Sequence, residues 1–146
     1  MYITYNNNDK DVINAAAFPI KNVVALGYIK DLRLCYAACD VVVLPSWHEG
    51  FSYSLLEGAA AGKPLVGSDI PGIDSIIIRD KNGLLVPPDN SEALAEAIIA
   101  LKRDPDLRKQ MGYLGRQYVE QYFDRKVFNK FVLDYYDRIG IKSYNA

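Results

Sequence analysis

The sequence predicts an α/β protein: a Rossmann-like, doubly wound parallel sheet followed by C-terminal helices. Two observations carry this prediction. Short apolar runs alternate with helical segments from residue 23 to residue 86, and each run ends at or near a glycine or proline. Strands that are apolar on both faces and alternate with helices are typical of parallel sheets. Because the chain has 146 residues, half of them apolar, we expect one domain over residues 1–146.

The first third of the chain is expected to contribute three strands and two helices. The strands share β-prone, apolar residues and are expected at residues 2–5, 23–27 and 41–44. The two later runs lack polar alternation, so we expect them to be buried on both faces. A brief helical stretch is expected to end before Pro19, and a second helix is expected at residues 32–39. Cys35 and Cys39 fall in that second helix and are interpreted as reduced helix residues.

Two more strands and four helices are expected in the remainder. The strands are residues 65–67 and 83–86. Residues 73–78 are a short helix or a turn. The first helix follows the loop at residues 46–50 and is expected to end before Gly62 and Pro64, and the second includes residues 94–101. The third is expected to begin at Pro105, with Asp104 as its N-cap, and the fourth to begin after its N-cap, Asp124.

The last of these helices carries a broad apolar stripe. Its members follow helical spacing and are Val127, Phe128, Phe131, Val132, Tyr135, Tyr136 and Ile139. Such a stripe is expected to be buried in a core or against another chain, and where it is exposed it favours association.

Charge and hydropathy exclude several classes of protein. The 17 basic and 18 acidic residues are interspersed and give a net charge of -1, so no basic track exists for nucleic acid. No apolar run approaches the length of a membrane span, and the N-terminus does not resemble a signal peptide. We therefore expect a cytoplasmic location, with the membrane surface as the alternative.

The stretch from Pro45 to Glu57 contains the candidate catalytic and ligand-binding residues. It follows an expected strand, forms a loop and enters a helix, and ligands of open α/β sheets bind beyond the carboxyl ends of the strands. Gly50 allows close approach of a ligand, and free N–H groups at the start of the helix suit a diphosphate. Glu57, about one and a half turns into the helix, faces either the sheet or the ligand crevice. There its carboxylate could accept hydrogen bonds from two neighbouring hydroxyls, such as those of a ribose.

These residues resemble a known signature. Residues 45–57 match the pattern Pro-Ser-x-x-Glu-Gly-Phe-Ser-x-x-Leu-Leu-Glu, which resembles the signature of the family-four (group 1) retaining glycosyltransferases of GT-B fold. Four further segments match the family pattern; they are residues 23–27, 61–64, 69–72 and 82–87. With them, the resemblance extends over nearly the whole chain. The chain is similar to the C-terminal, nucleotide-sugar-binding lobe of that family without its first strand and helix.

The resemblance implies a role for each matched residue. Glu57 resembles the glutamate that holds the ribose hydroxyls, and Glu49 the catalytic glutamate beside the donor sugar. The donor-binding residues implied at the sugar, the phosphates and the base are Gly50, Phe51, Ser52, Tyr53, Tyr28 and Ile29, with Lys30 as a further candidate at the base.

The implied function is transfer of a sugar from a nucleoside diphosphate sugar to a glycan or lipid with retained configuration, in polysaccharide biosynthesis. No cofactor and no metal are expected. The chain departs from the family pattern at Ser75, where the family has glutamate, and it lacks the upstream strand with its phosphate-binding arginine and lysine. We therefore expect the chain alone to be inactive. The alternative is an assembly subunit that pairs with a separate N-terminal lobe, or with a second copy, through the last helix.

Simpler interpretations stay open for the residues of this stretch. Glu57 could be a solvated helix glutamate, and Glu49 a surface charge favoured near a helix N-terminus. His48, the only histidine, has no identifiable partner and is interpreted as a loop side chain. Trp47 could stack on a sugar or pack at the base of the loop.

Overall fold

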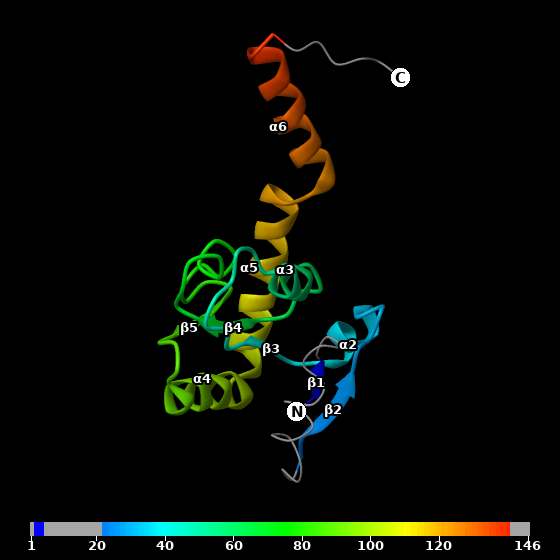
Figure 1. The fold of residues 1–146 in the computed structure, drawn as a ribbon. Helices are drawn as coiled ribbons and strands as arrows, with labels where there is room; N and C mark the ends of the chain where they lie inside the picture. Colours follow the sequence, from blue (N-terminus) through cyan, green and yellow to red (C-terminus); the bar gives the residue numbers. More distant parts are fainter. Residues whose placement is uncertain (1, 5–21, 141–146) are drawn as a thin grey trace. The chain divides into compact units, whose positions relative to one another are not determined.

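The structure, a computed structural model, describes residues 2–4 and 22–140. The chain divides into two units, Met1–Cys35 and Tyr36–Ala146. Both contain parallel strands, as the sequence predicts (Figure 1). The helical stretch predicted before Pro19 lies outside the described residues.

The first unit contains one pair of strands. β1 (Tyr2–Thr4) pairs in parallel with β2 (Val24–Gly27). Both strands lie where they were predicted. The prediction that residues 23–26 are buried on both faces is wrong, because Val24 and Leu26 are 46% and 38% exposed. A two-stranded ribbon has no core of its own to cover both of its faces.

The second unit is built on a three-stranded parallel sheet. β3 (Val42–Leu44), β4 (Leu65–Ser68) and β5 (Gly83–Val86) lie in the order β3-β4-β5, and every residue of β4 is buried. These three strands coincide with the predicted ones to within two residues at each end. The helix before the sheet, α2 (Arg33–Ala38), is one residue shorter at each end than predicted, and both cysteines are free thiols.

Side chains on the two faces of this sheet enter two separate cores. One face packs on α3 (Tyr53–Ala60) through a core that includes Leu55, Ala59 and Leu65. The other face packs on α4 (Ser91–Arg103) and on the start of α5 (Pro105–Tyr122) through a core that includes Val66, Leu101 and Met111. Because side chains alternate along a strand, Leu65 and Val66 enter opposite cores.

Capping residues define where the helices of the second unit begin. Asn90 caps α4 through Ala93 N–H, and Asp104 caps α5 through Leu107 N–H with Pro105 at the first helical position, as predicted. Gly62, with φ of +71°, follows the end of α3. Residues 73–76 form a turn, the second of the two predicted alternatives. The buried Asn82 stabilises this region by donating to the Ile76 carbonyl at 2.9 Å.

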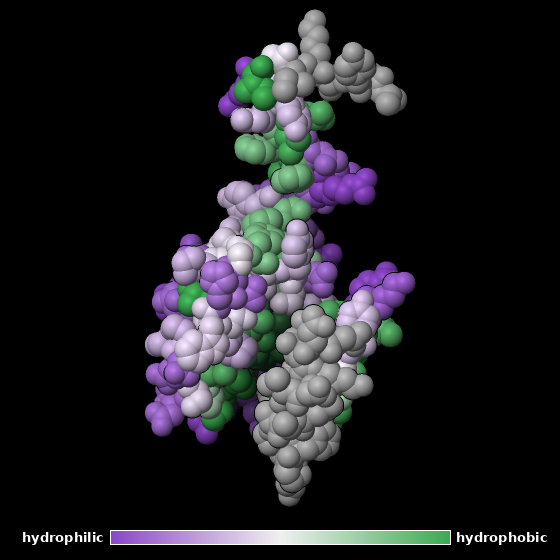
Figure 2. Space-filling model, viewed as in Figure 1, coloured by the Kyte–Doolittle hydropathy of each residue, from purple (hydrophilic) through white to green (hydrophobic). Residues whose placement is uncertain are grey.

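The last helix, α6 (Arg125–Arg138), is capped by Asp124 as predicted, but none of its residues is buried. Figure 2 shows apolar and charged side chains intermingled along it. The apolar stripe is largely exposed, with Phe131 69% exposed. The stripe is therefore not buried in a core within the described part of this chain, and its burial against another chain stays a prediction.

The contact between α5 and the end of α3 gives a test of the packing. A Cβ added to Gly112 would overlap the Gly62 carbonyl, whereas one added to Gly115 would meet Asn82 and Ala59 at ordinary distances of 3.4 and 3.6 Å. We expect Gly112→Ala to lower the free energy of unfolding by about 1–3 kcal/mol through overpacking. Gly115→Ala should be neutral or stabilising, because alanine is the better helix former by about 1 kcal/mol. Denaturant unfolding of both variants checks this, and equal stabilities would contradict the packing.

Candidate functional site

The candidate site lies where β3 and β4 end. The loop from β3 to α3, residues 45–52, lies against the turn that follows β4. The contact depends on Gly72, which has φ of +91° and whose added Cβ would overlap the backbone of Glu49. A side chain at Gly72 would therefore displace the loop that carries Glu49.

The start of α3 supplies donors for an anion. Ser52 is buried and caps the helix: its hydroxyl accepts from Leu55 N–H at 3.3 Å. The helix begins at Tyr53, so Phe51 lies before it. The apolar Phe51 instead packs its ring on Tyr53 and Phe123, at centroid distances of 5.3 and 5.8 Å. The first-turn N–H groups of Tyr53 and Ser54 have no acceptor within the helix, so they are available to a ligand.

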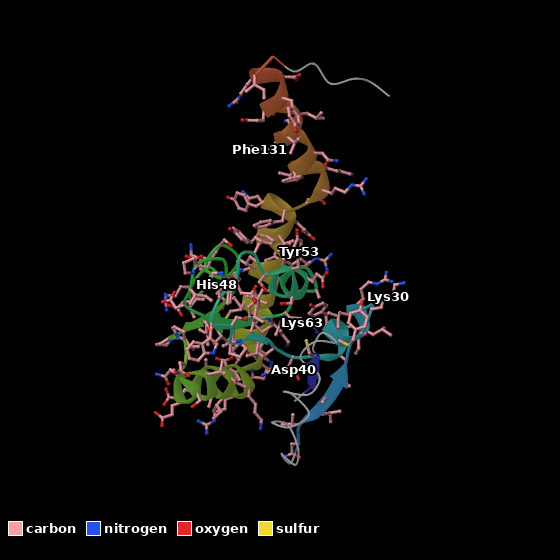
Figure 3. All side chains as sticks on the ribbon, in the orientation of Figure 1. Lys30, Asp40, His48, Tyr53, Lys63 and Phe131 are labelled. Carbon is pink, nitrogen blue, oxygen red and sulfur yellow. The ribbon has the colours of Figure 1, made fainter. Side chains whose placement is uncertain are left out.

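Glu49 is held in place. It is half-buried in the loop, and the Ser46 hydroxyl donates to its carboxylate at 2.9 Å. The neighbouring His48 is exposed and makes no hydrogen bond with the described residues. Figure 3 places His48 in this loop and Tyr53 at the start of the helix that follows. The carboxylate of Glu49 is thus oriented by its own loop.

Glu57 lies on the outer side of α3. It is exposed, so the interpretation that it faces the sheet is wrong, since Leu55 and Ala59 take that side. Tyr53, 70% exposed, is four residues earlier on the same side of the helix. No hydrogen bond or ion pair with the described residues occupies the Glu57 carboxylate. Both of its oxygens are therefore free to accept hydrogen bonds.

Tyr28 and Ile29 belong to the first unit, directly after β2. Gly27 has φ of +71°, Tyr28 is exposed and Ile29 is half-buried. A few residues on, the Arg33 guanidinium donates to both carboxylate oxygens of Asp31, and these hydrogen bonds lower the pKa of Asp31 to about 2. Asp31 therefore stays ionised at any physiological pH, although a fully exposed pair adds little stability.

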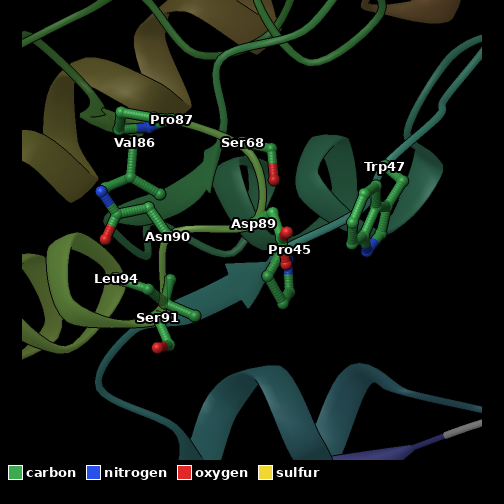
Figure 4. A pocket seen from close by; sticks show the side chains of 9 residues that line it. All are labelled: Pro45, Trp47, Ser68, Val86, Pro87, Asp89, Asn90, Ser91 and Leu94. Atoms are coloured by element: carbon green, nitrogen blue, oxygen red, sulfur yellow. The ribbon is translucent and has the colours of Figure 1, made fainter.

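A cavity of about 210 Å³ lies at the carboxyl ends of all three strands of the second unit (Figure 4). Its lining residues come from the ends of the strands and from the start of α4: Pro45 and Trp47 after β3, Ser68 of β4, Val86 of β5, Pro87 after it, and Asp89, Asn90, Ser91 and Leu94 before and within α4. Trp47 is 72% exposed, which contradicts packing at the base of the loop. Sequence reasoning missed Ser68 and the residues before α4, because their only signal was a position just after a predicted strand.

Among residues 2–4 and 22–140, no three His, Cys, Asp or Glu side chains gather as a metal site would require. None of the helices in that part of the chain is long and apolar enough to cross a membrane.

Comparison with known proteins decides the family. The family model of the group 1 glycosyl transferases matches residues 9–118. The chain belongs to the group 1 glycosyl transferases. The match includes β2, the loop with Glu49, all of α3 and the cavity.

Relatives of this glycosyl transferase support the same family and the GT-B fold. The N,N'-diacetylbacillosaminyl-diphospho-undecaprenol alpha-1,3-N-acetylgalactosaminyltransferase of Campylobacter jejuni is 36% identical over 114 residues, which cover 78% of this chain and 30% of that enzyme. Anabaena Alr3699/HepE, crystallised with UDP, matches with a TM-score of 0.86 at 23% identity, over 94% of this chain and 40% of that one. The C-terminal domain of LpcC from Francisella tularensis matches with a TM-score of 0.66 at 28% identity, over 80% of this chain and 60% of that one.

This glycosyl transferase chain spans less than a third of the length of the curated relatives that it matches. In the turn after β4, the Ser75 hydroxyl donates to the Gly72 carbonyl at 2.9 Å. Ser75 thus closes the turn that supports the Glu49 loop.

The cap of α3 can be tested by stability. Ser52→Ala removes the acceptor of Leu55 N–H, and we expect it to lower the free energy of unfolding by about 1 kcal/mol. Ser91→Ala, an exposed first-turn serine of α4 whose cap is Asn90, should change it by less than about 0.5 kcal/mol. Thermal or denaturant unfolding separates the two variants. If Ser52→Ala is as stable as Ser91→Ala, the hydroxyl does not hold the helix start.

Proposed function

We propose that this chain is the donor-binding lobe of a retaining glycosyltransferase that takes a sugar from a nucleoside diphosphate sugar. The observation that carries the proposal is the joint geometry of the Glu49 loop and α3. One segment at the ends of the strands carries three groups in order. They are the half-buried carboxylate of Glu49, the first-turn N–H groups of α3, and the exposed carboxylate of Glu57. These are the groups that a sugar, a diphosphate and a ribose require.

The diphosphate is assigned to the start of α3. The N–H groups of Tyr53 and Ser54 and the positive end of the helix dipole favour an anion there. Gly50 has open space around its α-carbon, so a ligand can approach the backbone closely. Charge develops on the diphosphate as the sugar leaves, and fixed N–H donors stabilise that charge without reorganising.

The ribose is assigned to Glu57. An ionised carboxylate accepts a hydrogen bond from each of two neighbouring hydroxyls, and hydrogen bonds to a charged group contribute about 1.5–3 kcal/mol each. Because no described residue competes for this carboxylate, the hydroxyls need to displace only water.

Glu49 is assigned to the donor sugar. The hydrogen bond from Ser46 fixes the carboxylate before a ligand arrives, which is what a group acting at a reaction centre needs. We place Glu49 beside the sugar as a positioning and charge-stabilising group. A double displacement would need a nucleophile opposite the leaving group, and the described residues do not identify one.

Similarity to known enzymes supports this proposal. HepE, of the same fold, was crystallised with UDP, and the Campylobacter jejuni relative is a glycosyltransferase. Tyr28 and Ile29 are proposed to border the nucleotide base. We further propose that the reaction requires an N-terminal lobe for the acceptor and no metal ion.

A specific observation favours a second candidate, an assembly role for α6. Its apolar residues include the exposed Phe128, Phe131 and Leu133, and no described element packs over them. Exposed apolar surface of this kind marks interaction sites. The partner would be an N-terminal lobe or a second copy of this chain.

The donor site is tested by Glu57→Ala. Calorimetric titration with UDP, GDP, ADP and their glucose and N-acetylglucosamine conjugates should show binding of one nucleotide class to the chain. The variant should weaken that binding by about 100-fold or more, because two hydrogen bonds to a charge, each contributing about 1.5–3 kcal/mol, are lost. Glu96→Ala, an exposed glutamate of α4, is the matched control and should bind as the parent does. Equal affinities of the two variants would remove Glu57 from the site.

The assembly role is tested by Phe131→Asp. Sedimentation should show concentration-dependent association of the parent chain, or a complex with a co-expressed N-terminal lobe, and this variant should abolish it. Lys130→Asp introduces the same side chain on the polar side of α6 and should leave association intact. A parent chain that remains monomeric and captures no lobe contradicts the assembly role and leaves the donor site untouched.

A further inference from the structure

We infer that the cavity at the ends of β3, β4 and β5 is a separate binding site for one neutral sugar unit, with Trp47, Ser68 and Asp89 as its recognition groups. None of the residues assigned above to the nucleotide sugar, from Glu49 to Glu57, lines this cavity. The inference therefore stands or falls independently of the donor site.

The buried hydroxyl of Ser68 points to a ligand. Ser68 is only 2% exposed, yet its hydroxyl makes no hydrogen bond with the described residues. The side chain lines the cavity, and Figure 4 shows the hydroxyl directed toward its interior. No fully buried side-chain nitrogen or oxygen of the described residues lacks a hydrogen-bond partner, so this hydroxyl is open to the solvent of the cavity, and a ligand there would replace water as its partner.

The walls of the cavity suit a carbohydrate. Trp47 presents a largely exposed indole at one side, and Pro45, Pro87 and Leu94 supply apolar surface. The apolar face of a pyranose packs on such surface, while its hydroxyls need a few placed polar groups. A wholly apolar ligand would leave Ser68 unpaired.

The charges in the cavity exclude an anion. Asp89 is exposed and makes no ion pair or hydrogen bond with the described residues. No residue that lines the cavity is basic. A phosphate would meet an uncompensated carboxylate, whereas sugar hydroxyls would donate to it.

The size of the cavity limits the ligand to about one ring. Its 210 Å³ is below the roughly 300–1,000 Å³ of sites that hold drug-sized ligands. A single unit of a glycan would occupy this space, and a complete nucleotide sugar would extend beyond it into solvent. The sugar could come from the end of an acceptor glycan or from a free saccharide, since both present the same hydroxyls.

The experiment uses the only tryptophan of the chain as its reporter. Trp47 emission and its single indole N–H signal are followed while methyl glycosides of glucose, galactose, mannose and N-acetylglucosamine are added, and separately inorganic phosphate. At least one glycoside should shift both signals saturably, with a dissociation constant in the millimolar range, and phosphate should not.

Three variants make the result specific. Ser68→Ala should weaken glycoside binding about three- to tenfold, the effect of one lost hydrogen bond. Asp89→Gly should weaken it too without loss of fold, because glycine suits the φ of +60° at that position. Glu96→Ala, at an exposed position of α4 outside the cavity, should bind as the parent does. Circular dichroism verifies that each variant is folded.

The outcomes separate this site from the donor site. Glycoside binding that persists in Glu57→Ala, and that a disaccharide glycoside shares, supports a separate site for a glycan end. A disaccharide that fails where the free monosaccharide binds supports a free saccharide as the source. No shift with any glycoside, stronger binding of phosphate, or equal affinity of Ser68→Ala and Glu96→Ala would overturn the inference.

Discussion

The loop with Glu49 depends on the backbone contact at Gly72. At φ of +91° and with the Glu49 carbonyl in the place of a Cβ, only glycine lets the turn after β4 approach the loop after β3. The turn itself is tied to β5, because Asp69 N–H donates to the Val86 carbonyl at 2.7 Å and Arg79 pairs with Asp69. The loops after three neighbouring strands are thereby held together.

That constraint gives the two glutamates different environments. Glu49 lies in the supported loop, with its carboxylate oriented by Ser46, whereas Glu57 projects from the exposed side of α3 with no partner among the described residues. A preorganised carboxylate suits a role beside a reacting bond, and an open one suits hydroxyls that arrive with the ligand. The spacing of seven residues matters because it separates a loop position from a helix position.

Most of the fold was predictable because its signals are local. The three strands of the second unit follow from continuous apolar runs, and the caps Asp104 and Asp124 follow from single residues at helix starts. The packing of Phe51 on Phe123 was not predictable, because the two residues lie far apart in the sequence. The exposure of Val24 and of the α6 stripe depends on what covers them, and no sequence pattern states that.

The candidate site was predictable only in part. Its residues from Glu49 to Glu57 lie in one segment, which a motif can mark, and the family follows from the match over residues 9–118. The cavity brings Trp47 together with Ser68 and Asp89, which come from loops that meet only because parallel strands end at the same edge. A tertiary arrangement of this kind leaves no signal in the local sequence.

The central claim is that the start of α3 and Glu57 together hold a nucleoside diphosphate. Mapping backbone amide shifts in a two-dimensional NMR spectrum during titration with UDP, GDP and ADP tests it most directly. The account predicts that one nucleotide perturbs the amides of Gly50, Tyr53, Ser54 and Glu57 most strongly, while those in the middle of α4 remain unchanged. Shifts that concentrate elsewhere in the chain, with these four amides unmoved, would contradict it.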